Sequence, residues 1–365
     1  MNIILIILVF GVIIFFHELG HFIVAKINHI TVKEFSMGFG PKLFQFHKKE
    51  TQYTLRLIPL GGYCMMLSED DEENENDENS FEKKSIWARM AVVLAGPAMN
   101  FVIAFLFSMV IIHFCGSDPA IIGAVYNKDN IEKYQIENAE EYFNGVYPAE
   151  EAGISDGDRV LKIEGSTVKN FRELQIYLQI YGDGSPIDLT LEEEDGTVYD
   201  TTVHPAKTPD GYKIGIMSVG YQLPKNFGEL CKYSAYETRY WVKATFLSLK
   251  LIVTRQVSSD EVSGPVGVAK NMNDTFNEAA KSSVLDLFLN WMNYIVLLSA
   301  NLGVMNLLPI PGLDGGRFIF LLIEAVTRKK VPKDKENIVT LIGFVLVMLL
   351  MVVILFNDIK NVFFH

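Results

Sequence analysis

Cysteine is scarce in this sequence, and its scarcity excludes two kinds of architecture. The 365 residues include three cysteines, Cys64, Cys115 and Cys231, and no Cys-x-x-Cys pair is among them. Neither a disulfide framework nor a cysteine-ligated zinc site is therefore indicated. Free thiols are the simpler interpretation, and a Cys115–Cys231 bridge outside the cell is the alternative.

Positive charge is also in short supply. Lysine and arginine number 32 against 44 aspartates and glutamates, which gives a net charge of −12 at pH 7. No basic stretch carries interleaved aromatic residues, so nucleic acid is not an expected partner. Eight of the acidic residues lie in one run, residues 69–78 (EDDEENENDE). We interpret this run as a solvated, disordered linker.

The hydrophobic N-terminus lacks the basic start of a secretory signal peptide. Residues 1–16 contain no charged side chain, and the apolar character resumes at residues 22–25. We therefore expect an uncleaved membrane span. Hydrophobic residues make up 49% of the chain and the mean hydropathy is +0.20. These values indicate a membrane protein that also carries a soluble domain.

Four apolar stretches are long enough to cross a lipid bilayer, which is therefore an expected partner. They lie at about residues 3–27, 87–114, 287–308 and 338–356. Gly96 and Pro97 predict a break in the second span that another helix must cover. Lysine and arginine gather between spans one and two and between spans three and four. Both loops are thus predicted to be cytoplasmic, with both chain termini extracytoplasmic.

Three ionisable residues interrupt the first span in the motif HELGH. His17 and His21 are four positions apart, so they share one face of a helix, as ligands of a metal ion must. Ionisable side chains inside a lipid-spanning helix are costly unless they are paired or bound to metal. A chance HExxH on a soluble helix would be harmless because water solvates it, but lipid removes that water. The motif therefore indicates a functional site.

A third ligand is predicted far away in the sequence. NLLPIPGLDGG, residues 306–316, ends the third span with prolines and glycines that unwind a helix and let Asp314 turn inward. Two histidines and one carboxylate leave zinc one position for water, which is the catalytic arrangement. Glu18 projects about 100° round the helix from His17. We therefore assign Glu18 to proton transfer from water and not to the metal.

Residues 35–66 mix apolar residues with glycine and proline, which predicts a β-hairpin beside the first span. Its exposed edge can pair with an extended substrate. The alternative is a hairpin that only packs on the helices.

Between spans two and three the sequence predicts a small β-rich domain. PAEEAGISDGDRVLKIEG, residues 148–165, resembles the bacterial PDZ signature. A strand at 121–125, a helix at about 170–181 and strands near 187–191 and 197–203 complete the pattern. Residues 127–147 make a longer connection than such domains need, so the peptide groove is expected to be altered or covered. A surface segment should follow, with an amphipathic helix at about residues 229–254.

Taken together, the motifs resemble the bacterial site-2 protease family, intramembrane zinc metalloproteases of the sigma-E-regulator type. HELGH, GFGP, GGY, AGPAMNF, SGPVGVA and NLLPIPGLDGG occur in this order over nearly the whole chain. The resemblance implies a Zn²⁺ ion held by His17, His21 and Asp314, with Glu18 as the catalytic acid and base. It also implies a set of substrate-binding residues: Asn306, Gly61, Gly62 and Tyr63.

The resemblance further implies a multi-pass protein of the bacterial cell membrane. Its expected substrates are single-span proteins already shortened by another protease, such as anti-sigma factors, or remnant signal peptides. Many relatives carry two PDZ domains and this chain has one, which weakens the idea of a two-domain size filter.

The expected fold is an α-helical polytopic membrane protein with about four transmembrane helices, a membrane-associated β-hairpin and one inserted extracytoplasmic PDZ domain. Its parts are an N-terminal membrane part (1–115), the PDZ domain (118–207), an extracytoplasmic amphipathic segment (208–284) and a C-terminal membrane part (285–365).

Two functions of other classes compete with proteolysis. A membrane PDZ scaffold needs no metal and would leave HELGH and LDGG unexplained. A metal transporter should carry ligands along several spans, whereas the other spans here supply asparagine and serine.

Overall fold

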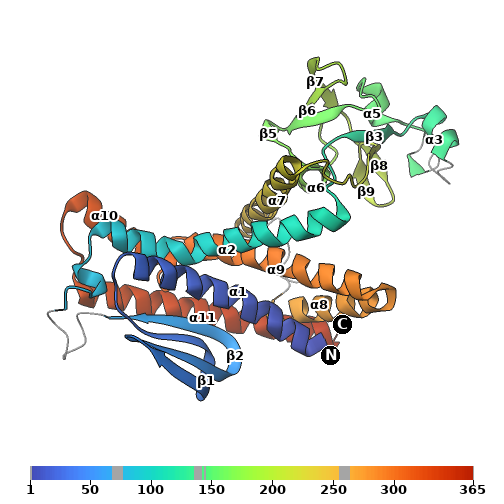
Figure 1. The fold of residues 1–365 in the computed structure, drawn as a ribbon. Coiled ribbons are helices and arrows are strands. Elements are labelled where there is room, and N and C mark those ends of the chain that lie inside the picture. Colours follow the sequence, from blue (N-terminus) through green and yellow to red (C-terminus); the bar gives the residue numbers. More distant parts are fainter. Residues whose placement is uncertain (1, 68–76, 135–141, 144, 255–263, 365) are drawn as a thin grey trace. The chain divides into compact units, whose positions relative to one another are not determined.

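The computed structural model describes residues 2–67, 77–134, 142–143, 145–254 and 264–364 (Figure 1). Most of the predicted acidic linker, residues 69–76, lies outside this part of the chain. Contacts between residues divide the chain into two compact units. Unit 1 comprises Met1–Ser108 and Thr245–His365, and unit 2 comprises Met109–Ala244.

Among the described residues, four helices are long and apolar enough to cross a membrane, which confirms the predicted number of spans. They are α1 (Asn2–Ile27), α2 (Ile86–Cys115), α9 (Val284–Leu307) and α11 (Lys333–Phe364). The chain is thus a polytopic membrane protein. Only 6% of the apolar window of α11 is buried within the protein, so most of this helix is free to face lipid.

The predicted break in the second span is wrong. α2 continues through Pro97 as one helix, because a proline removes only one N–H from the helical ladder and neighbouring helices cover the site. A Cβ atom on Gly20 of α1 would lie 2.3 Å from the carbonyl oxygen of Ala95. On another side, the Ser299 hydroxyl of α9 donates a hydrogen bond of 2.9 Å to the Asn100 carbonyl.

The segment that precedes the third span is only partly the surface segment that the sequence predicted. α7 (Phe227–Val253) matches the predicted amphipathic helix. α8 (Pro265–Ser282) instead buries Met272 and Phe276 fully in the core of unit 1, against α1 and α9. Its first turn is held by Asp358 of α11, whose carboxylate accepts hydrogen bonds from three backbone N–H groups of the SGPVGVA motif.

The predicted hairpin is present beside α1 (Figure 1). β1 (Val32–Lys48) pairs with β2 (Thr51–Met66) in an antiparallel register with several irregularities. Phe35 pairs with Cys64 on one side and with Tyr53 on the other, so the two bent strands form a small sheet in which residues 62–66 make one edge. The sheet exposes apolar side chains from near its turn out to its far end, where Phe39 pairs with Ile58; they are Phe39, Leu43, Phe44, Phe46, Leu55, Leu57 and Ile58.

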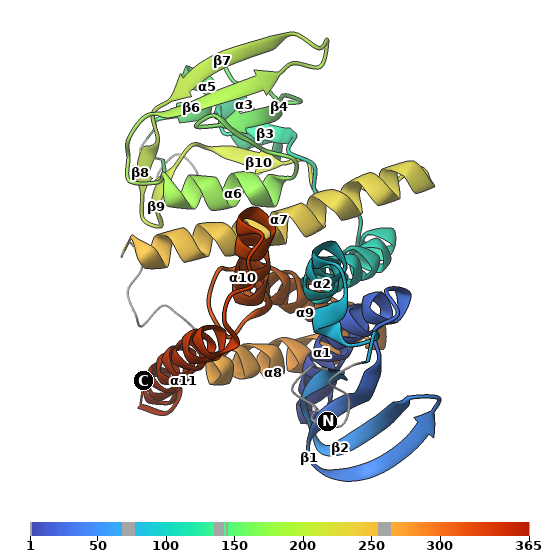
Figure 2. The same ribbon diagram turned by 90° about the vertical axis from the view of Figure 1, so that its left-hand side faces the viewer.

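Unit 2 is β-rich, as predicted. Its main sheet has the strand order β5-β4-β6-β7, and β3 pairs separately with β10. The strands are β3 (Ile122–Val125), β4 (Arg159–Ile163), β5 (Ser166–Thr167), β6 (Ile187–Glu192), β7 (Val198–Val203), β8 (Ala206–Thr208), β9 (Gly211–Lys213) and β10 (Ile216–Ser218). The helices are α3 (Lys128–Tyr134), α5 (Pro148–Glu151) and α6 (Phe171–Ile180), with α6 alongside β10 in Figure 2.

The predicted end of this domain at residue 207 is too early. β10 lies beyond it and pairs with β3, which is almost a hundred positions earlier in the chain. A local pattern does not reveal such a pairing, because the two strands share no turn.

All three cysteines are in the thiol form. The structure therefore agrees with the simpler interpretation and does not contain the Cys115–Cys231 bridge that was its alternative.

Candidate metal centre

The three predicted ligands come together in unit 1. His17 and His21 lie one turn apart on α1, and Asp314 is the first residue of α10 (Asp314–Thr327). One ligand atom from each residue lies within 4.8 Å of the other two. Asp314 Oδ2 is 3.2 Å from His17 Nε2 and 3.5 Å from His21 Nε2. The two Nε2 atoms are 3.3 Å apart.

A sharp turn between α9 and α10 delivers Asp314, as the prolines and glycines of its loop predicted. α9 ends at Leu307, and Gly312 has a positive φ of 99° that other residues rarely adopt. Gly315 packs so closely on the end of α9 that a Cβ atom would lie 2.2 Å from the Leu308 carbonyl oxygen. A larger residue would therefore push the start of α10 away from α1.

An ion pair holds α10 against α2. Arg89 donates two hydrogen bonds to Glu324, of 2.6 and 3.1 Å, in the paired geometry that suits guanidinium and carboxylate. Leu321 packs beside this pair on Met90 and Val93 of α2. Because Asp314 begins the same helix, these contacts help to set its position.

The opposite ring nitrogens of the histidines are occupied by α2. His21 Nδ1 lies 2.8 Å from the Val92 carbonyl oxygen, to which it can only donate, so its Nε2 keeps a lone pair for a metal. His17 Nδ1 lies 3.2 Å from the Asn100 side-chain amide, whose Oδ1 is buried without a hydrogen-bond partner. A half-turn of this amide lets Oδ1 accept the Nδ1–H of His17. Both Nε2 atoms then face Asp314 as acceptors.

This donor set fits a cation. Asp314 Oδ2 is buried and has no hydrogen-bond donor among the described residues. Three electron-rich atoms that face one another without a proton between them repel, unless a positive ion lies among them. Two imidazoles and one carboxylate are a set that Zn²⁺ accepts.

Gly96 and Asn100 are residues that sequence reasoning did not assign to the site. A Cβ atom on Gly96 would lie 2.3 Å from His21 Nε2 and 2.8 Å from His17 Cε1. Only glycine therefore lets α2 approach the two rings. Asn100 is fully buried in an apolar span, and this polar residue in an apolar span was the signal available in the sequence.

Glu18 lies against the sheet and lines the same cavity as the ligand cluster. It lines a cavity of about 370 Å³ with the three ligand side chains and with Tyr63 and Cys64 of β2. A Cβ atom on Gly62 would lie 3.3 Å from Glu18 Cγ. The structure thus brings the predicted hairpin residues beside the predicted acid and base.

Two side chains of the sheet at this cavity, Cys64 and Tyr63, have a defined protonation state and a defined position, respectively. Burial, and next the Glu18 carboxylate, raise the pKa of the Cys64 thiol to about 12, so Cys64 is a neutral thiol at pH 7. Arg56 donates hydrogen bonds to the Tyr63 hydroxyl (2.6 Å) and to Glu34 (2.9 Å), which fixes Tyr63 at the cavity.

Two other predicted substrate residues lie further from the ligands. Gly61 has a φ of 102°, and its α-carbon packs on the Phe39 ring so closely that no side chain fits there. Asn306 is half-buried near the end of α9 and is not among the described residues that line the cavity. Its predicted role in binding substrate stays a prediction.

Comparison with known proteins agrees with this geometry. The model of peptidase family M50 matches residues 5–350. The chain belongs to peptidase family M50. It is a zinc metalloendopeptidase of the site-2 protease type.

Several curated relatives match over almost their whole length. A putative zinc metalloprotease of Clostridium acetobutylicum is 37% identical, over 98% of this chain and 97% of that protein. The zinc metalloprotease RasP of Geobacillus kaustophilus is 32% identical, over 99% and 98%. The regulator of sigma-W protease RasP of Bacillus subtilis is 29% identical, over 98% of each chain.

The contact at Gly96 yields a test of the site. Gly96→Ala places a methyl group 2.3 Å from His21 Nε2, which displaces the ring. Zinc affinity should therefore fall by about ten-fold or more, although alanine favours helix. Gly228→Ala, near the start of α7, is the control, because its Cβ would meet only the Asn226 side chain, at 3.2 Å. Metal analysis of the purified proteins, with circular dichroism to check folding, measures the effect. A folded Gly96→Ala variant with full zinc would show that the close approach is not required.

Proposed function

We propose that this chain hydrolyses peptide bonds within the transmembrane segments of single-span proteins. His17, His21 and Asp314 are the proposed zinc ligands, and Glu18 is the proposed catalytic acid and base. The observation that carries the proposal is the convergence of three ligand atoms, within 4.8 Å, at an apolar helix long enough to cross a membrane. A scaffold has no use for this arrangement.

When zinc is bound, it supplies a Lewis acid that polarises the scissile carbonyl and lowers the pKa of water towards about 7. The protein residues divide the remaining work. Glu18 takes the proton from the attacking water and delivers it to the nitrogen of the leaving amine. Its place in the same cavity as the ligands allows this transfer without passage through lipid. The Val92 carbonyl and Asn100 keep both imidazoles oriented.

A transmembrane substrate must be unwound before it can be cut, because helical peptide groups are hydrogen-bonded to one another. The edge formed by residues 62–66 lies beside Glu18 and offers backbone groups to an extended chain. Gly61, Gly62 and Tyr63 are the proposed substrate-engaging residues of this edge. The Asn306 amide is proposed to hold a further backbone group of the substrate.

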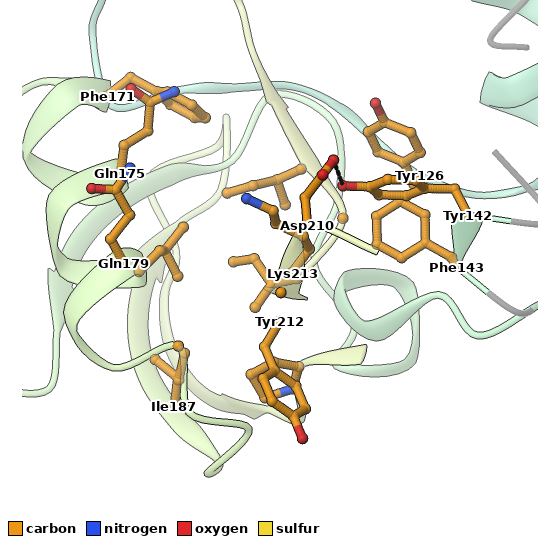
Figure 3. Close-up of a pocket in the computed structure, with 17 residues that line it drawn as sticks. Tyr126, Tyr142, Phe143, Phe171, Gln175, Gln179, Ile187, Asp210, Tyr212 and Lys213 are labelled. Carbon is orange, nitrogen blue, oxygen red and sulfur yellow. Dashed lines mark hydrogen bonds between the residues drawn. The ribbon is translucent and has the colours of Figure 1, made fainter. Parts of the chain in front are cut away.

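Unit 2 is proposed to be a PDZ domain with an altered groove. A cavity of about 690 Å³ lies between α6 and residues 210–216 (Figure 3). Tyr142 and Phe143, from the long connection after β3, line it, and the Tyr142 hydroxyl donates a 3.0 Å hydrogen bond to Asp210. These contacts support the expectation that the groove differs from an open peptide site.

The proposed substrates are single-span proteins that another protease has shortened, such as anti-sigma factors, and remnant signal peptides. The name of the Bacillus subtilis relative, regulator of sigma-W protease, supports the first class. We also propose a bacterial cell-membrane location with both termini extracytoplasmic, from the lysine and arginine bias of the loops.

Substitution of Glu18 separates binding from chemistry. Glu18→Gln should keep one zinc per chain and lose peptide cleavage, because Glu18 acts on water and not on the metal. Alanine at any of the three proposed ligands should lose zinc and cleavage together. Zinc content and cleavage of a single-span reporter measure the two properties. Equal zinc loss in Glu18→Gln would contradict the assignment.

The unwinding step predicts a dependence on substrate helicity. Asn306→Ala should slow cleavage at unchanged zinc content, since it removes a partner for the released backbone groups. Glycine or proline in the substrate span should partly restore the rate, because a weaker helix needs less help to unwind. Cleavage rates for matched substrates in the two enzymes test this. Rates that ignore substrate helicity would show that unwinding is not limiting.

Removal of the PDZ domain tests whether it gates access. Ser117 and Gln222 exchange two backbone hydrogen bonds, of 2.8 and 2.9 Å, so residues 118–221 can be replaced by a short glycine linker without separating these ends. A folded substrate ectodomain is some tens of ångströms across and would be held back by a domain on the same side of the membrane. The deletion should therefore allow cleavage of full-length substrate, with pre-cut substrate cleaved as before. Loss of cleavage of the pre-cut form would mean that the domain delivers substrate.

A further inference from the structure

We propose that a pocket at the end of α1 binds the phosphate-bearing headgroup of an anionic phospholipid. The pocket has a volume of about 430 Å³ and lies where the last turn of α1 meets the turn between β1 and β2. Its lining includes four basic side chains, Lys26, His29, Lys48 and Lys49, and one acidic side chain, Glu50. It shares no residue with the cavity at the metal centre, so the proposal does not depend on proteolysis.

The acidic residue does not neutralise this pocket. Glu50 pairs with Lys26 at 3.8 Å, and its side chain is 66% exposed to solvent. An exposed pair at this distance contributes little and exchanges readily with water. Lys48 and Lys49 add two further positive charges on the adjoining turn. Among the described residues that line the pocket, an anion therefore meets more positive than negative charge.

The carbonyl groups at the end of α1 are hydrogen-bonded within the chain, so they do not compete with an anion for the lysine side chains. A helix C-terminus usually repels anions, because its last carbonyl oxygens point outward. Here the carbonyl oxygens of Val24, Ala25 and Lys26 all accept hydrogen bonds from residues 28–30 of the same chain. The ammonium groups thus remain the dominant charges that face the pocket.

The pocket lies at the level of a membrane surface. α1 is apolar from its start and ends at Ile27, one residue after Lys26. Further along the same helix, Gly62 of the sheet packs against Ile14, well inside the span. The sheet therefore extends from the depth of Ile14 to a lysine-bearing turn at the end of the span. Lysines at this position are the arrangement that attracts anionic lipid headgroups.

Neighbouring apolar surface favours a lipid over a free phosphate ion. Tyr53 lines the pocket, lies 5.9 Å from the Phe22 ring and stacks on Phe46 at 4.9 Å. Phe46 belongs to the exposed apolar surface of the sheet, with Phe44 and Leu43 nearby in sequence. Acyl chains can cover this surface while the phosphate occupies the pocket. Aromatic rings are commonly found at such a boundary.

The test is a titration of the purified full-length protein with phosphatidylglycerol, followed by native mass spectrometry. A lysine near a membrane surface contributes about five-fold to the affinity for anionic lipid. The variant with Lys26, Lys48 and Lys49 all changed to glutamine should therefore bind about a hundred-fold more weakly. Glu50→Gln should bind about five-fold more tightly, because it removes the one acidic side chain among the described residues that line the pocket. Lys281→Gln is the control, since Lys281 is exposed and pairs with Glu278 outside the pocket.

Glu50→Gln keeps the test decisive if the triple variant does not fold, because a gain in affinity does not come from damage to the structure. Equal binding of phosphatidylcholine would overturn the proposal, as would an unchanged affinity in Glu50→Gln. Displacement of the lipid by inorganic phosphate at equal concentration would assign the pocket to free phosphate and overturn the lipid assignment.

Discussion

Polar groups inside an apolar span have no water to bind, and this constraint organises unit 1. Three polar side chains in the spans around the centre meet a protein group from another element. His21 meets the Val92 carbonyl, Asn100 meets His17, and Ser299 meets the Asn100 carbonyl. These contacts require the helices to approach closely, and the glycines of α1 and α2 make that approach sterically feasible. The ligand geometry follows from the helix packing.

The sequence predicts the parts of this structure that depend on local pattern. Run length predicts the four spans, the spacing of HELGH places both histidines on one helical face, and the Pro/Gly loop predicts the turn that delivers Asp314. Features that depend on distance between helices are not readable in this way. The continuity of α2 through Pro97 and the need for glycine at position 96 both come from a neighbouring helix. The pairing of β10 with β3 and the burial of α8 also depend on contacts between segments far apart in the sequence, so local pattern does not predict them.

α1 serves the metal centre and the sheet at once. His17 and His21 face α2 and α10, whereas Glu18 and Ile14 face Gly62. The strand edge at residues 62–66 packs on the face of α1 that carries Glu18 and Ile14. Because the histidines lie on the same helix, its regular geometry fixes the position of this edge relative to the ligands. A substrate chain paired with residues 62–66, as proposed, would therefore inherit that register and present its peptide groups to Glu18 at a repeatable position. Such rigid geometry favours catalysis by proximity, because small displacements of the reacting groups lower the reaction rate strongly.

The same sheet links the site to the bilayer. Its inner edge lies at Glu18, its apolar far end is exposed, and its lysine-bearing turn lies at the end of α1. A lipid headgroup held at that turn would hold the sheet at one depth, because charged and apolar ends prefer different layers of the membrane. The edge beside Glu18 would then be held at the same depth. The position at which a transmembrane substrate meets Glu18 would thus depend on the bilayer as well as on the protein.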